Sequence, residues 1–141
     1  MENSQNIEKL IYTGKTRTTG GRIGNAKSSD GKLEIILSTP GSKGNGTNPE
    51  QLLAAGWSAC YIGALGIAAK GAGITLPNDM FVDAEIDLIT IETAFQLQAR
   101  LKVNLPGLAP EIAEHLIETA HQTCPYSKAL QGNIPITTIL V

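Results

Sequence analysis

The sequence has few of the residues that mark specialised classes of protein. Only two of its 141 residues are cysteines, aromatic residues make up 4%, and charged residues make up 17%. Two cysteines are too few for a disulfide scaffold. The net charge is −2 and no run of lysines or arginines occurs, so we expect no nucleic-acid partner.

The first ten residues, MENSQNIEKL, lack the apolar region of a secretory signal peptide and contain Glu2 and Glu8. The expected location is therefore the cytoplasm, where thiols are kept reduced. In that compartment, Cys60 and Cys124 are expected to be free, catalytic or redox-active thiols rather than a structural bridge.

Charge is absent from a long segment around the first cysteine. Residues 51–69 contain no Asp, Glu, Lys or Arg, and this length must be considered as a membrane span. The segment is rich in alanine and glycine, has few large aliphatic residues, and follows Glu50 rather than a basic flank. These features favour a buried helix, so we expect no membrane partner.

The remaining pattern predicts one α+β domain over residues 1–141, because 42% of the residues are hydrophobic and no linker divides the chain. Asn48, Pro49 and Glu50 form a strong helix start, whereas Gly71 and Pro125 end helices. The expected strands are residues 9–20, 22–27, 32–39, 80–92, 94–104 and 134–141, and the expected helices are residues 49–70 and 110–123 with a short turn at 126–130.

The surroundings of the two cysteines leave several readings open. Cys124 continues the apolar stripe of the second helix, and Gly56 and Gly63 lie one turn from Cys60, where they indicate close approach of a backbone or room for a ligand. Both cysteines could be small core residues. His121 could act as a base for a cysteine nucleophile. A metal site of Cys60, Cys124 and His121 has no supporting CxxC, HxH or HExxH spacing, so no metal is expected.

Several motifs, in order along residues 10–141, narrow this choice. The segments TGGR, NPEQL, ACYIGAL and HQTCPYS resemble the organic hydroperoxide resistance (Ohr) branch of the Ohr/OsmC family. The resemblance implies that Cys60 is a peroxidatic nucleophile and Cys124 its resolving thiol. It also implies that Arg22 pairs with Cys60 and that Glu50 orients Arg22.

The same resemblance implies an intertwined homodimer with antiparallel sheets wrapped around two central helices, and no cofactor. Its expected substrates are organic hydroperoxides, including those of fatty acids, and its expected reductant is a dihydrolipoyl group. A non-catalytic lipid-binding or small-molecule-binding protein and a redox sensor of the same fold are the alternatives. The residues predicted to shape the substrate pocket are Trp57, Tyr61, Gly56, Gly63 and Phe95.

Elementary chemistry agrees with the implied roles. A thiol with a pKa of about 8.5 is mostly protonated at neutral pH, and apolar burial makes it less reactive still. Arg22, or less favourably Arg17, would supply the cation that a thiolate needs. Glu50 lies ten residues before Cys60, roughly 15 Å along a straight helix. A relay from Glu50 through Arg22 to Cys60 is therefore expected to cross between two subunits.

Overall fold

The computed structural model describes residues 8–141. The contacts of the chain divide it into two compact units, Met1–Asn48 and Pro49–Val141. The division falls immediately before the long helix, and the expectation of one domain stays a prediction.

The first unit contains a small antiparallel sheet in the order β1-β2-β3. Its strands are β1 (Thr16–Thr19), β2 (Asn25–Ser28) and β3 (Glu34–Ile36), with a turn of 3-10 helix, η1 (Gly21–Ile23), between the first two. The predicted strand over residues 9–20 is too long. Thr16 pairs with Ser28, the last residue of β2, so the residues before Thr16 have no strand beside them in this sheet.

Glycine is required in the turn that carries Arg22. Gly20 and Gly21 have φ values of 75° and 58°, a region that disfavours residues with a Cβ atom. A Cβ atom on Gly24 would lie 1.8 Å from the carbonyl oxygen of Thr19, which no side chain could tolerate. The backbone of the TGGRIG segment therefore requires glycine at positions 20, 21 and 24, whatever the role of Arg22.

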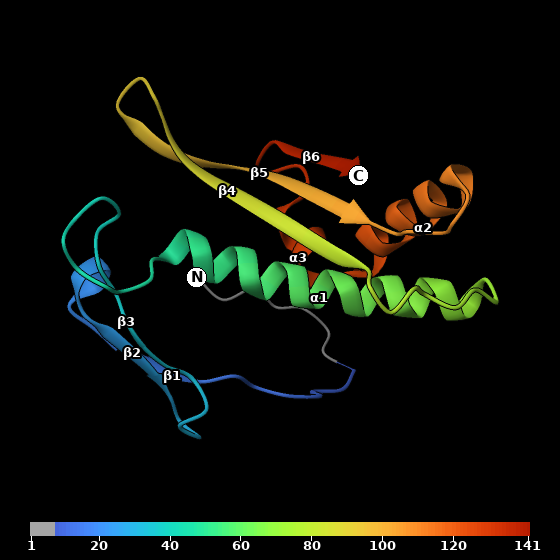
Figure 1. Ribbon diagram of the computed structural model, residues 1–141. Helices are drawn as coiled ribbons and strands as arrows, with labels where there is room; N and C mark the ends of the chain where they lie inside the picture. Colours follow the sequence, from blue (N-terminus) through green and yellow to red (C-terminus); the bar gives the residue numbers. More distant parts are fainter. Residues whose placement is uncertain (1–7) are drawn as a thin grey trace. The chain divides into compact units, whose positions relative to one another are not determined.

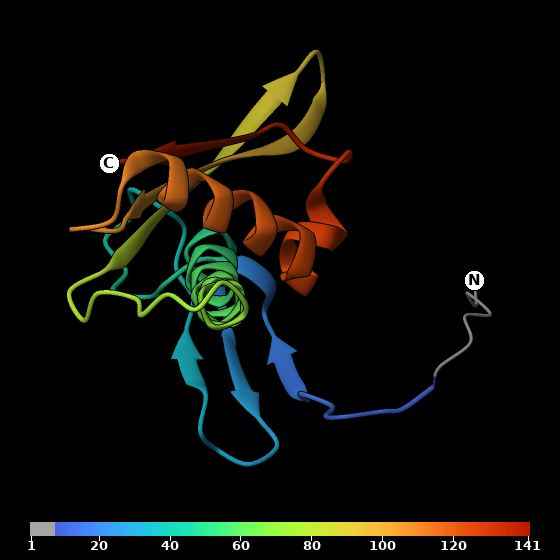
Figure 2. The same ribbon diagram turned by 90° about the vertical axis from the view of Figure 1, so that its right-hand side faces the viewer.

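The second unit contains three helices and a three-stranded sheet. The helices are α1 (Pro49–Gly71), α2 (Pro110–Thr123) and α3 (Pro125–Leu130), and the strands are β4 (Phe81–Ile91), β5 (Ala94–Asn104) and β6 (Ile136–Leu140). The predicted boundaries of these elements are confirmed to within about two residues. Figure 1 and Figure 2 both show α1 and α2 beside each other, and the two helices share one core with the inner face of the sheet.

The expectation of purely antiparallel sheets is wrong for this unit. β4 and β5 pair as an antiparallel hairpin, but β6 pairs parallel to β5, with Ala99 opposite Ile136. The strand reaches this position because α2 and α3 lie between β5 and β6 in the sequence and carry the chain back to the start of the sheet, as a parallel crossover requires.

Helix α1 is long and apolar enough to cross a membrane by length and composition alone. Its fully buried side chains, such as Trp57, Tyr61 and Leu65, instead pack against the sheet and the other two helices. We therefore assign α1 as the core helix of this unit, as the sequence predicts.

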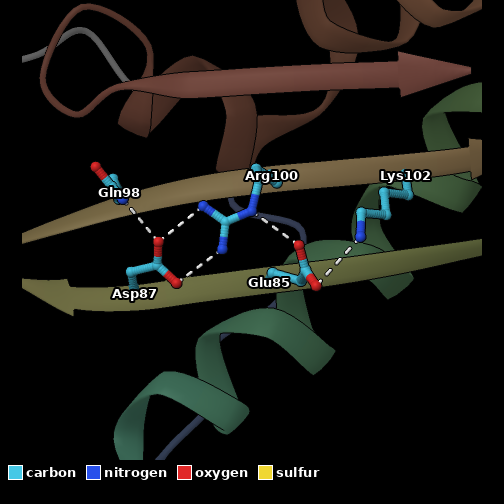
Figure 3. A network of polar contacts seen from close by, with 5 residues as sticks. All are labelled: Glu85, Asp87, Gln98, Arg100 and Lys102. Atoms are coloured by element: carbon cyan, nitrogen blue, oxygen red, sulfur yellow. Dashed lines mark hydrogen bonds and ion pairs between the residues drawn. The ribbon is translucent and has the colours of Figure 1, made fainter.

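The outer face of the sheet carries a network of charged side chains (Figure 3). Two guanidinium nitrogens of Arg100 donate to the carboxylate of Asp87 at 2.7 and 2.8 Å, and Nε of Arg100 donates to Glu85 at 2.8 Å. Gln98 donates to Asp87 at 2.7 Å, and Lys102 lies 3.3 Å from Glu85. These hydrogen bonds, above all those from Arg100, lower the pKa of Asp87 to about 2.

The lowered pKa of Asp87 predicts an acid-dependent stability. A carboxylate whose pKa is lower in the folded state stabilises the fold above its unfolded pKa, and this contribution disappears as the pH falls from about 4 to about 2. Asp87→Asn should therefore show a shallower loss of thermal stability over this pH range than the wild type, measured by circular dichroism. Asp83→Asn, on the same strand but outside the network, is the control. An unchanged slope for Asp87→Asn would contradict the prediction.

Candidate active site

The two cysteines, distant in sequence, meet inside the second unit. The Sγ atom of Cys124 donates a hydrogen bond to the Sγ atom of Cys60 at 3.2 Å, and both thiols are free. Cys124 is fully buried, whereas Cys60 is partly exposed. A disulfide has an S–S length of about 2.05 Å, so a movement of about 1 Å would join the two sulfurs.

The local sequence explains how Cys124 reaches α1. Pro125 disfavours helical backbone at the residue before it, and Cys124 accordingly has the extended values φ −64° and ψ 119°. Its backbone N–H still donates to the carbonyl oxygen of Ala120 at 2.8 Å, so it closes α2 before α3 begins. The chain therefore bends at Cys124, and this bend is where α2, α3 and α1 meet.

The surroundings of Cys60 disfavour its thiolate form. Burial raises the pKa of the Cys60 thiol, the neighbouring Cys124 raises it further, and a hydrogen bond from the backbone of Tyr126 opposes them. Burial is the largest of these effects. A positive charge from another part of the protein would be needed to make Cys60 a good nucleophile at neutral pH.

Gly56 and Gly63 have different surroundings, although both are interior residues of α1. A Cβ atom on Gly56 would lie 3.1 Å from the hydroxyl oxygen of Tyr126 and 3.4 Å from two of its ring carbons. The close neighbour of Gly56 is therefore the Tyr126 side chain and not a backbone segment, which was one of the two expectations. At Gly63, nothing in the described chain lies within 4 Å of an added Cβ atom.

Two of the predicted pocket residues, Trp57 and Tyr61, belong to the core of the second unit, and their role in a pocket stays a prediction. Trp57 and Tyr61 are fully buried, because each finds an acceptor for its polar atom there. Nε1 of Trp57 donates to Oγ of Ser127 at 3.0 Å, and the Tyr61 hydroxyl donates to the carbonyl oxygen of Ile117 at 2.8 Å. Phe95 is 75% exposed beside the β4–β5 turn, and its role in a pocket stays a prediction.

The charged residues predicted for the site belong to different units. Arg22 is an exposed residue of η1 in the first unit, whereas Glu50 lies in the first turn of α1, on the same helix as Cys60. The roles of Arg22 and Glu50 at the thiol pair stay predictions.

His121 does not form the base–nucleophile pair that was one of the alternatives. Its Nδ1 atom lies 3.0 Å from Oγ of Ser127, and its Nε2 atom lies 2.7 Å from Oγ1 of Thr138. Burial lowers the pKa of His121, which favours the neutral ring. Sequence reasoning missed Ser127 and Thr138, although a buried tryptophan near Cys60 signals that an acceptor must lie nearby.

No group of three or more His, Cys, Asp or Glu residues within residues 8–141 has the arrangement of a metal site.

Comparison with known proteins assigns the chain to a family. The model of the family described as OsmC-like protein matches residues 41–139. The chain belongs to the OsmC-like protein family. It is 42% identical to the organic hydroperoxide resistance protein of Xanthomonas axonopodis pv. citri, an alignment that covers 94% of this chain and 96% of that protein.

Solved structures agree with this OsmC-like assignment. The crystal structure of the organic hydroperoxide resistance protein OhrB of Bacillus subtilis superposes with a TM-score of 0.88 at 37% identity, covering 94% of this chain and all of that one. An organic hydroperoxide resistance protein from Elizabethkingia anophelis gives a TM-score of 0.86 at 41% identity over 94% of this chain and 97% of that one. The predicted Ohr branch of the family is thereby confirmed.

The glycine at position 56 provides a test of the site geometry. Gly56→Ala adds a Cβ atom 3.1 Å from the Tyr126 hydroxyl oxygen, so the Tyr126 side chain, two residues after Cys124, must shift by a few tenths of an ångström. We expect disulfide formation between Cys60 and Cys124 to slow by roughly threefold or more, because small misplacements of reacting atoms are costly. Stopped-flow measurement of thiol oxidation tests this.

Gly71→Ala, at the open end of the same helix, is the matched control because nothing lies within 4 Å of its added Cβ atom. Wild-type rates of closure in both variants would show that Gly56 does not position Tyr126.

Proposed function

We propose that this chain is a thiol-dependent peroxidase that reduces organic hydroperoxides, including those of fatty acids, to alcohols in the cytoplasm. Membership of the Ohr branch supports a role in defence against organic hydroperoxides. The observation that carries the proposal is the pair of free thiols with sulfur atoms 3.2 Å apart, one partly exposed and one fully buried.

The proposed cycle has three steps. The Cys60 thiolate attacks the terminal oxygen of the hydroperoxide, the O–O bond breaks, and the alkoxide leaves as the alcohol after taking a proton. Cys60 is then a sulfenic acid. The Cys124 thiol attacks the sulfur of that sulfenic acid and displaces water, which leaves a Cys60–Cys124 disulfide. An external dithiol of the dihydrolipoyl type reduces this disulfide to two thiols and becomes a disulfide itself.

Activation of Cys60 is proposed to come from Arg22. Burial raises the pKa of the Cys60 thiol, and a guanidinium group would lower it and could also hold a peroxide oxygen. The glycine-specified turn at residues 20–24 supports this proposal, because it presents Arg22 in a defined backbone geometry. Glu50 is proposed to orient Arg22 and to balance its charge.

A homodimer is proposed because the other elements of the second unit leave one face of α1 uncovered. One side of the helix is exposed although it carries small and apolar side chains, and Ile67 on this side is 65% exposed. The open space at Gly63 would allow a second helix to approach closely. The exposed residues of this face are Ala55, Ala59, Ile62, Gly63 and Ile67.

The peroxidase proposal predicts a clear dependence on both cysteines. With excess dihydrolipoamide, the wild type should reduce an aryl-alkyl hydroperoxide over many turnovers and much faster than hydrogen peroxide. Cys60→Ser should produce no alcohol above background. Cys124→Ser should form a Cys60 sulfenic acid that a 1,3-diketone traps, detected by mass spectrometry. Alcohol formation is measured by chromatography.

Other outcomes would point to the alternative functions. A single stoichiometric oxidation without turnover indicates a redox sensor, and hydroperoxide binding without alcohol indicates a binding protein. Equal slow oxidation of the wild type and Cys60→Ser would end the peroxidase proposal.

The proposed sharing of residues between subunits can be tested by mixing inactive variants. Cys60→Ser and Glu50→Ala chains, unfolded together and refolded, should form heterodimers with one intact site if Glu50 acts across the interface. We expect up to about one quarter of wild-type activity from a statistical mixture, in which half of the dimers are heterodimers with one working site each. The separately refolded variants are the controls. If the mixture shows no more activity than these controls, Glu50 acts within its own chain.

A further inference from the structure

A buried chain of polar side chains runs beside the thiol pair and connects four elements. It begins at Trp57 on α1, passes through Ser127 on α3 and His121 on α2, and ends at Thr138 on β6. Ser127 and Trp57 are fully buried, and His121 is 8% exposed. The proposed peroxidase chemistry uses none of these four side chains.

The direction of donation along this chain follows from its first member. The indole N–H of Trp57 can only donate, so Oγ of Ser127 accepts it at 3.0 Å. Because His121 is the one acceptor recorded for the Ser127 hydroxyl among the described residues, the Ser127 proton is assigned to Nδ1 of His121. The proton on Nε2 of the neutral ring then goes to Oγ1 of Thr138. In this arrangement, no buried side-chain nitrogen or oxygen of the described residues lacks a hydrogen-bond partner.

Ser127 lies in the same turn of the chain as the resolving thiol. It follows Cys124 by three residues, and Trp57 precedes Cys60 by three residues. Two adjacent contacts therefore join α1 to the segment that begins at Cys124. One is the hydrogen bond from Trp57 to Ser127, and the other is the contact between the two sulfur atoms. The backbone hydrogen bonds from Lys128 to Cys124 and from Gln131 to Ser127 lie within this segment, whereas the side chain of Ser127 joins it to α1 and α2.

We propose that Ser127 is a positioning residue that keeps Cys124 in register with Cys60, and that His121 acts through Ser127 by accepting its hydroxyl proton. The hydrogen bond from Trp57 to Ser127 sets the distance from which Cys124 attacks an oxidised Cys60. Its use in catalysis rests on the proposed peroxidase function, whereas the register of the two thiols can be measured without any hydroperoxide.

A chromogenic disulfide separates these two questions. The Cys60 thiolate attacks 4,4′-dithiodipyridine, which breaks its S–S bond, releases one thiopyridone and leaves a mixed disulfide on Cys60. The Cys124 thiolate then attacks the Cys60 sulfur of this mixed disulfide and releases the second thiopyridone. The first release reports the reactivity of Cys60, and the second reports how well Cys124 is positioned.

Ser127→Ala should slow the second release by roughly tenfold or more, because closing a bond between preset groups depends steeply on their geometry. The first release should stay within about threefold of the wild type, since Cys60 is carried by α1 and burial, the largest effect on its pKa, does not depend on the Ser127 hydroxyl. Trp57→Phe, which removes the indole donor, should slow the second release in the same way and serves as an independent variant if Ser127→Ala does not fold.

His121 offers a rescue test that a purely structural role would not pass. His121→Ala removes the acceptor of the Ser127 proton and should slow the second release. His121→Asn places an amide oxygen near the position of Nδ1 and should recover part of the rate. Thr123→Ala is the matched control, because its exposed hydroxyl lies next to Cys124 in the sequence but bonds only to the carbonyl oxygen of Thr119 at 3.0 Å.

Two results would overturn the proposal. One is a wild-type second release in folded Ser127→Ala or Trp57→Phe, and the other is an equal slowing in Thr123→Ala. If the wild type closes rapidly with 4,4′-dithiodipyridine but forms no alcohol from hydroperoxides, the peroxidase function fails while the positioning role of Ser127 stands.

Discussion

The arrangement of the site depends on one contact, the packing of the segment that begins at Cys124 against a single turn of α1. This contact brings two sulfur atoms to 3.2 Å although the cysteines are 64 residues apart in the sequence. It needs a glycine at position 56 to admit the Tyr126 side chain and an extended residue before Pro125 to turn the chain. The core of the second unit supports it, because Trp57 and Cys124 belong to the same buried cluster.

The burial that brings the thiols together also opposes their chemistry. Burial would protect the sulfenic acid of the proposed cycle from side reactions. It also raises the pKa of Cys60 and reduces the share of thiolate. Within the second unit, the hydrogen bond from the backbone of Tyr126 is the effect that lowers this pKa. The proposed role of Arg22 follows from this imbalance, since a permanent cation offsets desolvation without accepting the proton of the thiol.

Local signals in the sequence were sufficient to predict most helices and strands. They also singled out Cys60 and Cys124. The bounds of α2 and β5 follow from proline, glycine and hydrophobic periodicity, which act within a few residues. The motif around Cys60 and Cys124 was specific enough to indicate the family before any geometry was known. The direction of β6 and the short extent of β1 depend on which strand is available as a partner, and periodicity carries no such information.

Individual side chains were harder to place than elements. Trp57 and Tyr61 were predicted as pocket residues, and the hydrogen bonds that hold them in the core, to Ser127 and Ile117, come from distant parts of the sequence. Such pairings depend on tertiary packing and cannot be read from spacing along one helix. The unequal burial of the two cysteines has its own consequence for the oxidised protein. In the proposed cycle, an incoming dithiol would reach the partly exposed sulfur of Cys60 but not the buried sulfur of Cys124. Cys124 would then be the leaving group, and the mixed disulfide with the reductant would form on Cys60, the residue proposed to react with the peroxide.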